Sequence, residues 1–146
     1  MNIEYYGKLP DSQNIYSIEE DLSPDALRII LLARMTDAAL RGVELSEDET
    51  YDWIDKLAGD EILVSRDEET SEINGMIAHN KDTKRDWVSY LAVMPTERGG
   101  GIGKALIEAV RAQADGLLVA GEATPTSETY YEHLGHDVGR DGVVTA

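Results

Sequence analysis

The stretch YLAVMPTERGGGIGKALIEAV, residues 90–110, carries the clearest structural signal in the sequence. It begins with apolar, β-favouring residues up to Pro95, continues through a run of glycines, and then repeats apolar residues at helical spacing. The spaced apolar residues are Ile102, Ala105, Leu106, Ala109 and Val110. The stretch therefore predicts a strand, a glycine-rich loop and an amphipathic helix that ends near residues 115–116.

A helix that begins directly after glycines offers an anion-binding site. The first backbone N–H groups of a helix have no partner within it, and glycine lets a ligand approach them closely. Arg98 and Lys104 stand at the two ends of the loop, where their positive charges favour a phosphate group. A glycine-rich connector that binds no ligand is the structural alternative.

The spacing excludes two common nucleotide-binding loops. A Walker-type loop needs four residues between its first glycine and the Gly-Lys pair, whereas Gly99 and Gly103 have three between them. It also needs Ser or Thr after the lysine, where this chain has Ala105. The dinucleotide fingerprint fails as well, because Lys104 occupies the position of its third glycine.

The pattern that does fit is R-x-x-G-x-G after a strand and a proline, and it resembles the GCN5-related N-acetyltransferase (GNAT) family. A second segment, TSETYYEHLGH at residues 126–136, resembles the late helix of the same family. The resemblance covers most of the chain and is strongest from residue 61 onward.

The resemblance implies an α/β (α+β) fold: a mixed, mostly antiparallel central sheet with helices on both faces, whose fourth and fifth strands splay apart. It implies acetyl-CoA as the co-substrate. The arginine, the glycines and the helix start would hold its pyrophosphate, and the preceding strand would bind its pantetheine arm. The implied cofactor-binding residues are Leu91, Ala92, Val93, Arg98, Gly99, Gly100, Gly101, Ile102, Gly103 and Lys104.

The resemblance also implies transfer of the acetyl group directly from the thioester to a primary amine of a small molecule or peptide. The backbone N–H of Val93 is the candidate for polarising the thioester carbonyl. Tyr131 aligns with the general acid that protonates the departing thiolate, with a packing tyrosine as the alternative. A non-catalytic acyl-CoA-binding regulatory module is the second functional hypothesis.

The sequence does not identify the residue that acts as general base. Trp87 and Ser89 occupy the fourth-strand positions where relatives carry Glu or His, and neighbouring Asp86 is expected to point to the opposite face. The remaining candidates, each with solvated surface as the alternative, are Glu72, His79, Glu122 and His133. A water relay through Ser89 and spontaneous deprotonation of a weakly basic amine are equally compatible with the sequence.

Upstream of the glycine loop, the first strand is expected at residues 15–18, with residues 3–6 as an alternative or additional edge strand. Ser23-Pro24-Asp25 predicts the start of a helix that ends near Gly42. A capping box at residues 46–49 predicts a second helix that continues through Trp53 to Gly59.

Residues 61–65, 73–79 and 87–94 predict three strands joined by short polar turns, as in an antiparallel meander. Downstream, residues 117–120 predict a central strand and residues 125–134 a last helix. Residues 136–140 and 143–146 predict a final hairpin. Nothing marks a domain boundary, so we expect residues 1–146 to form a single acetyltransferase domain.

The chain is strongly acidic. Its 146 residues include 29 Asp and Glu against 13 Lys and Arg, which gives a formal net charge of -16. Such a surface repels nucleic acid, including an aminoacyl-tRNA acceptor, and favours cationic amines. With eight Arg and only five Lys, it is also typical of a halophilic protein in molar salt, an ordinary acidic protein being the alternative.

The composition excludes further kinds of functional site and further classes of protein. No cysteine is present, so disulfides, Cys-based metal sites and Cys nucleophiles are excluded, and we expect no metal. The longest apolar run, residues 29–33, is too short to cross a membrane, and the first residues lack the layout of a secretion signal. We therefore expect a cytoplasmic protein without membrane or nucleic-acid partners, and the family resemblance favours a homodimer.

Overall fold

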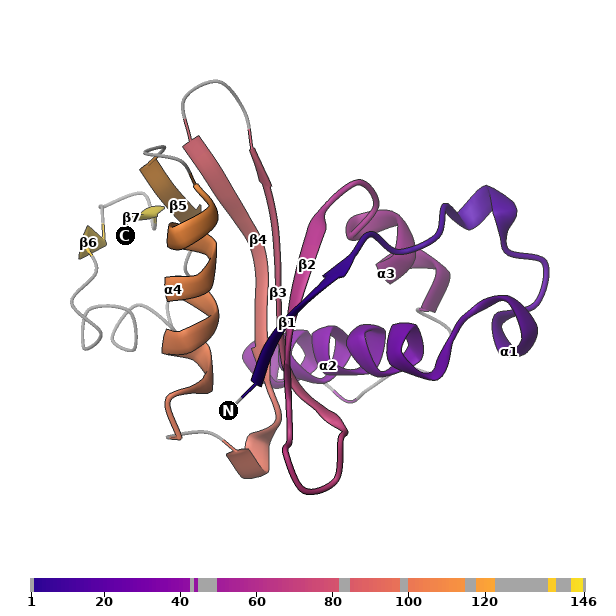
Figure 1. Ribbon diagram of the computed structural model, residues 1–146. Helices are drawn as coiled ribbons and strands as arrows, with labels where there is room; N and C mark the ends of the chain where they lie inside the picture. The colour runs from indigo at the N-terminus through magenta and orange to yellow at the C-terminus, as the bar shows by residue number, and fades with distance from the viewer. Residues whose placement is uncertain are drawn as a thin grey trace.

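The strands of the described residues form one seven-stranded sheet (Figure 1). The computed structural model describes residues 2–42, 44, 50–81, 85–97, 100–114, 118–122, 137–138 and 143–145. In chain order the elements are β1 (Asn2–Gly7), η1 (Ser12–Asn14), α1 (Ile18–Asp21), α2 (Pro24–Arg41), α3 (Thr50–Lys56), β2 (Glu61–Arg66), β3 (Ile73–Lys81), β4 (Arg85–Val93), η3 (Pro95–Glu97), α4 (Ile102–Gln113), β5 (Leu118–Glu122), β6 (Asp137–Val138) and β7 (Val143–Thr145). The strand order is β1-β2-β3-β4-β5-β7-β6. Among the strands of the described residues, only the β4–β5 pair is parallel, so the sheet is mixed and mostly antiparallel, as expected.

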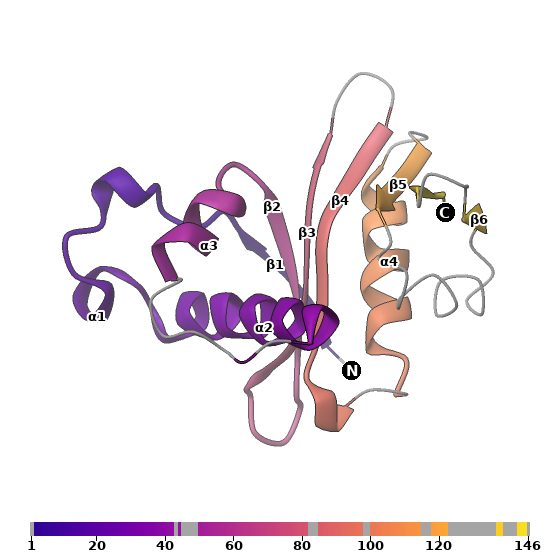
Figure 2. The ribbon, with the colours of Figure 1, turned by 180° about the vertical axis from the view of Figure 1, so that it is seen from behind.

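Helices cover both faces of the sheet (Figures 1 and 2). Helices α2 and α3 pack on one face, and α4 packs on the other. Because successive strand residues point to opposite faces, the buried central strands are apolar almost throughout. In β3, for example, Met76 and Ala78 contact the α2 side, whereas Ile77 between them contacts the α4 side.

Local sequence signals set the ends of α2. The hydroxyl of Ser23 accepts a hydrogen bond from the N–H of Ala26 at 3.1 Å, and Pro24 occupies the first turn. At the other end, Gly42 adopts the left-handed conformation with a φ of 68° and closes the helix. Both predicted ends of this helix are therefore confirmed.

Strands β4 and β5 are paired over only part of their length. The parallel register runs from Arg85↔Leu118 to Val88↔Gly121, whereas β4 itself continues to Val93. Figure 1 shows β5 beside only the beginning of β4. At this point β4 also contains a bulge, because Ala78 faces Tyr90 while His79 faces Val88, leaving Ser89 as an extra residue. Among the described residues, pairing between β4 and β5 therefore stops at Val88, as the expected splay of the fourth and fifth strands requires.

The start of the chain differs from the primary expectation. Residues 15–18 form no strand, and the alternative at residues 3–6 is the one that forms, as part of β1. The physical reason is local: the N–H groups of Tyr16 and Ser17 donate to the carboxylate of Asp21 at 2.7 and 3.0 Å. These bonds occupy the N–H groups that a sheet would need and turn the chain into α1.

The other predicted elements lie close to their expected bounds. The strands predicted at residues 61–65, 73–79, 87–94 and 117–120 correspond to β2, β3, β4 and β5, and β6 and β7 pair antiparallel as the predicted hairpin. The capping box at residues 46–49 and the last helix at residues 125–134 lie outside the described residues. Within the described part of the chain, no helix combines the length and the apolar character needed to cross a membrane.

Candidate functional site

The second half of β4 presents backbone groups to the same side on which β5 pairs with its first half. The N–H of Met94 donates to the carbonyl of Asn74 at 2.9 Å, and the antiparallel register continues from there through Gly75↔Val93. Because hydrogen-bonded pairs alternate along an antiparallel ladder, Leu91 and Val93 direct their N–H and C=O groups away from β3. Among the described residues no strand pairs with these groups, and in that part of the chain they form an open edge next to β5.

The side chains of this segment fix its orientation in the sheet. Leu91 and Val93 pack against the α4 core, and buried Ala92 packs against the α2 core. A strand held by apolar contacts on both faces cannot rotate, so its outward backbone groups are preorganised for a ligand.

A short, tightly turned segment joins β4 to α4. In η3, the N–H of Glu97 donates to the carbonyl of Met94 at 2.9 Å. Gly101 then adopts a left-handed conformation with a φ of 84°, and the carbonyl of this residue accepts the first helical bond, from Ala105 at 3.0 Å. The N–H groups of Ile102, Gly103 and Lys104 precede that bond and so have no partner within the helix. Together with the helix dipole, they make the start of α4 attractive to anions.

A glycine in β3 brings the start of α4 close to the sheet. A Cβ atom on Gly75 would lie 2.7 Å from Cγ2 of Ile102 and 3.3 Å from Cδ1 of Leu106. The first distance is shorter than any normal contact between carbon atoms, so the packing of α4 depends on glycine at this position. Since Gly75 is also paired with Val93, the β4 edge and the helix start are held next to each other.

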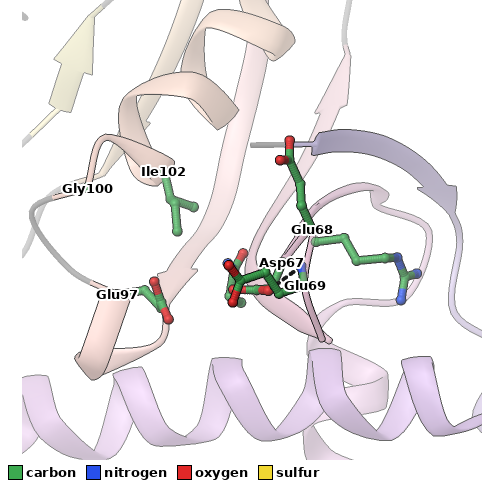
Figure 3. A pocket seen from close by; sticks show the side chains of 8 residues that line it. Asp67, Glu68, Glu69, Glu97, Gly100 and Ile102 are labelled. Atoms are coloured by element: carbon green, nitrogen blue, oxygen red, sulfur yellow. Dashed lines mark hydrogen bonds between the residues drawn. The ribbon is translucent and has the colours of Figure 1, made fainter. Parts of the chain in front are cut away.

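An open, acidic pocket of about 280 Å³ adjoins the start of α4 (Figure 3). In Figure 3, Glu97 lies on one side of the pocket and Asp67 and Glu69 lie on the other. The backbone N–H groups of Thr70 and Glu69 donate to the carboxylate of Asp67 and lower its pKa below the ordinary value. The lining residues are Arg66, Asp67, Glu68, Glu69, Asn74, Glu97, Gly100 and Ile102.

On the α2 face, the bulge of β4 is part of a polar group. The side-chain amide of Asn80 donates to Asp60 at 2.9 Å and, more weakly, to the hydroxyl of Ser89 at 3.4 Å. The second carboxylate oxygen of buried Asp60 has no hydrogen-bond partner within the described part of the chain. The sequence analysis did not predict this polar group. In the sequence, its only sign is Asp60, a polar residue directly before β2.

On the α4 face, the bulge is flanked by a buried histidine and aspartate. Nδ1 of His79 lies 2.8 Å from the carboxylate of Asp86, and both side chains are almost completely buried. Asp86 therefore shares the α4 face with Val93, although regular alternation predicts the opposite, because the extra residue Ser89 inverts the alternation. Asp86 still points to the opposite face from its neighbour Trp87, but across the bulge it is Asp86, and not Trp87, that shares a face with Val93.

The structure brings together part of the predicted site. The predicted residues of β4 lie next to those at the start of α4. The first group is Leu91, Ala92 and Val93, and the second is Gly100, Gly101, Ile102, Gly103 and exposed Lys104. Arg98, Gly99, Tyr131 and His133 lie outside the described residues, as does the side chain of Glu122.

The two remaining base candidates do not reach the open edge. His79 is enclosed on the α4 face, and Glu72 is exposed in the β2–β3 turn, 3.9 Å from Arg28. Among the described residues, no three His, Cys, Asp or Glu side chains are placed to hold a metal ion.

Comparison with protein families gives one match. Residues 58–137, more than half of the chain, match the model of the acetyltransferase (GNAT) domain. A search of curated protein sequences gives no significant match.

Solved structures with the same fold cover nearly the whole chain. A GNAT family acetyltransferase from Brucella melitensis, in complex with acetyl-CoA, has a TM-score of 0.60 at 22% identity, over 99% of this chain and 87% of that chain. An aminoglycoside 6'-N-acetyltransferase complexed with coenzyme A has a TM-score of 0.62 at 14% identity, over 99% of this chain and 94% of that chain. GCN5 from Tetrahymena has a TM-score of 0.61 at 14% identity, over 87% of this chain and 91% of that chain.

Proposed function

Because this chain belongs to the GNAT acetyltransferase family, we propose that it moves an acetyl group from acetyl-CoA directly to a primary amine of a small molecule or peptide. The observation that carries the proposal is that Gly75, which contacts the start of α4 and pairs with Val93, holds the edge of β4 next to that helix start. One linear ligand with an amide-containing arm and a pyrophosphate can occupy both.

Each end of the cofactor has a chemical partner in this arrangement. The pyrophosphate binds the N–H groups of Ile102, Gly103 and Lys104, with the charges of Arg98 and Lys104 in support. The amides of the pantetheine arm pair with the outward backbone groups of Leu91 and Val93, as an added strand would. Gly99, Gly100 and Gly101 allow the close approach of the phosphates.

The chemical step needs little beyond positioning. The lone pair of a neutral amine forms the N–C bond as the C–S bond breaks, and the electron pair of that bond stays on sulfur. The N–H of Val93 stabilises the negative charge that develops on the carbonyl oxygen. Tyr131 protonates the thiolate as it leaves, and because a phenol has a pKa of about 10 and a thiol about 8.5, this transfer is coupled to C–S cleavage.

The acceptor enters from the α2 face. There the hydroxyl of Ser89 and the carboxylate of Asp60 flank Asn80, and they supply hydrogen-bond acceptors for an amine and a path for its proton through water. The net charge of the chain attracts cationic acceptors. An aminoglycoside, the substrate class named for one of the solved structures, is such a cation.

Release of free thiol from acetyl-CoA tests the proposal, measured across a panel of primary amines that includes diamines, aminoglycosides and basic peptides. We expect turnover with at least one cationic amine. Tyr131→Phe should lower kcat about 100-fold while acetyl-CoA affinity stays unchanged, within the usual range for loss of a general acid. Tyr16→Phe is the matched control, because this tyrosine is 90% exposed and lies just before α1, which Figure 1 shows on the other side of the sheet from α4.

The same experiment separates the enzyme from the regulatory module. A chain that binds acetyl-CoA but releases no thiol with any amine would be a non-catalytic acyl-CoA-binding module. The half-buried Trp87 at the usual position of the base is the feature that favours this second function.

A further inference from the structure

We propose that Asn80 is a positioning residue for the acetyl transfer, because its side-chain amide sets the direction in which the hydroxyl of Ser89 passes on a proton. The ammonium group of the acceptor gives one proton to Oγ of Ser89 while the Ser89 O–H gives its own proton to water. The products of this relay are a neutral amine, ready to attack the thioester, and a protonated water. This role of Asn80 rests on the proposed function and adds to it the residue that orients the relay.

The place of Ser89 in β4 is the first observation. Ser89 directly follows Val88, the last residue of β4 that pairs with β5 in the described part of the chain, and it is the extra residue of the bulge. Its hydroxyl contacts the side chain of Asn80, which lies on the α2 face together with Ala78. The half-buried Ser89 therefore stands where the open edge of β4 begins, on the face from which the acceptor enters.

The hydrogen bonds of the Asn80 amide determine which of its two ends faces Ser89. Nδ2 of Asn80 donates to the carboxylate of Asp60 at 2.9 Å and to Oγ of Ser89 at 3.4 Å. A carboxylate accepts hydrogen bonds, so Asp60 requires the nitrogen of the amide, and not its oxygen, on this side. Asp60 is only 6% exposed, and its backbone N–H donates to the carbonyl of Leu57 at 3.1 Å. The carboxylate that orients the amide is therefore itself held in place.

This orientation decides what the hydroxyl of Ser89 can do. A hydroxyl has one donor and two acceptor sites. Asn80 occupies one acceptor site, and the described residues give the hydroxyl no other partner. The second acceptor site is left for an N–H of the acceptor, and the O–H is left for water. A relay needs both, whereas a carboxylate in place of the amide would bind the O–H and interrupt the relay.

The neighbouring side chains explain why a hydroxyl relay is needed. Trp87 pairs with Asn80 across the strands and shares the α2 face with it, but an indole N–H is a donor only. His79 and Asp86 are bonded to each other at 2.8 Å, enclosed on the α4 face. Ser89 therefore gives the proton of the acceptor a route to water without a base on β4.

The exchange variant Asp60→Asn/Asn80→Asp tests the direction of the bond to Ser89. It keeps an amide–carboxylate bond between the two positions, but a carboxylate then faces the hydroxyl. We expect a melting temperature and an acetyl-CoA affinity close to those of the wild type. For the best amine of the panel, we expect kcat/KM at neutral pH to fall about 100-fold, at the lower end of the usual range for a lost proton transfer.

The basicity of the acceptor separates a proton relay from a purely structural role. An analogue of the same amine with fluorine on the neighbouring carbon is less basic and mostly neutral at the same pH, so it needs no relay. The exchange variant and Ser89→Ala should both lose activity with the parent amine and keep nearly full activity with the analogue. In the Ser89→Ala background the exchange should cause no further loss, because Asn80 acts through Ser89.

Two further variants complete the experiment. Asn2→Asp is the matched control, because the Asn2 amide also donates to a carboxylate, that of Glu4 at 3.0 Å, on β1, which β2 and β3 separate from β4. It should leave all measured quantities unchanged. Asn80→Ala removes the exposed amide without adding a charge and serves if the exchange variant does not fold, as melting curves show. It should give a smaller loss that again disappears with the fluorinated analogue.

Wild-type kcat/KM for the parent amine in the folded variants of Asn80 would overturn the inference. Equal losses with the parent amine and its analogue would also overturn it, as would losses that add in full to that of Ser89→Ala, because both indicate a structural effect. If the wild type turns over an amine but these variants behave in one of these ways, the proposed function stands and only the role of Asn80 is wrong. If the wild type releases no thiol with any amine, the proposed function fails and the relay fails with it.

Discussion

Gly75 on β3 and Ile102 at the start of α4 are in contact so close that a Cβ on the glycine would lie 2.7 Å from Cγ2 of the isoleucine. Through this contact the sheet determines where α4 begins. The backbone of Gly75 is also paired with Val93, at the end of the open β4 edge. One residue without a side chain therefore aligns the two halves of the proposed acetyl-CoA site.

Gly75→Ala should weaken acetyl-CoA binding and destabilise the protein. The added methyl group overlaps the stiff, β-branched side chain of Ile102, and such overpacking costs about 1–3 kcal/mol. Denaturant unfolding measures the loss of stability, and calorimetry measures acetyl-CoA affinity. The double variant Gly75→Ala/Ile102→Ala provides room for the methyl group and should recover affinity relative to the single variant. Full affinity in Gly75→Ala alone would contradict the proposed alignment.

Gly101→Ala should act through backbone conformation alone. Gly101 has a φ of 84°, and a Cβ there meets nothing within 4 Å, so no clash contributes. A left-handed conformation costs most L-residues about 1–2 kcal/mol, whereas Asn tolerates it better. We therefore expect acetyl-CoA affinity to fall in the order Gly, Asn, Ala at this position. Equal affinities of the Asn and Ala variants would show that the conformation of this residue does not matter for binding.

Local chemistry explains which parts of the fold were predictable. The start of α2 at Ser23-Pro24 and its end at Gly42 depend on residues within the same few turns, and both are confirmed. The buried face of α4 follows from apolar spacing alone, and Ile102, Leu106 and Val110 are indeed buried. In these cases the residues whose interactions determine the element lie close together in the sequence.

The features that could not be predicted depend on residues far apart in the chain. The bulge at Ser89 is visible only in the register between β3 and β4, and it changes which side chains share a face with Val93. The pairs Asp60–Asn80 and His79–Asp86 likewise require strand pairing that no local pattern reveals. For the first strand, the contact of Asp21 with Tyr16 and Ser17 outweighed the β-propensity of residues 15–18.

Asp67 should contribute to stability at neutral pH but not in acid. Hydrogen bonds from the N–H groups of Thr70 and Glu69 lower its pKa in the folded state below that in the unfolded state. Its contribution is therefore complete above about pH 4, the ordinary value, and is lost as pH falls through the lower folded pKa. The difference in melting temperature between wild type and Asp67→Ala should be largest at neutral pH and should shrink in acid.

Asp67→Asn is the control for this titration, because its side-chain oxygen can still accept the same bonds but carries no charge. Its melting temperature should differ from that of Asp67→Ala by the same amount at every pH. A gap between wild type and Asp67→Ala that stays constant from neutral pH into acid would contradict the assigned pKa direction.

Salt should stabilise the protein at neutral pH. The net charge of -16 makes the folded chain repel itself, and salt shortens the range of this repulsion from about 10 Å at 0.1 M to about 3 Å at 1 M. We expect the melting temperature to rise between these two concentrations of KCl. Near the sequence isoelectric point of about 4.4 the same rise should shrink. A melting temperature independent of salt at neutral pH would remove the proposal that the acidic surface is adapted to high salt.

The most direct test of the proposed acetyl-CoA site is an NMR titration of the ¹⁵N-labelled protein with acetyl-CoA, which reports on individual backbone amides. We expect the largest shifts at the N–H groups of Leu91 and Val93 on β4 and of Ile102, Gly103 and Lys104 at the start of α4. The titration would contradict the account if these amides stay unchanged under saturating acetyl-CoA, or if the shifts gather on another surface.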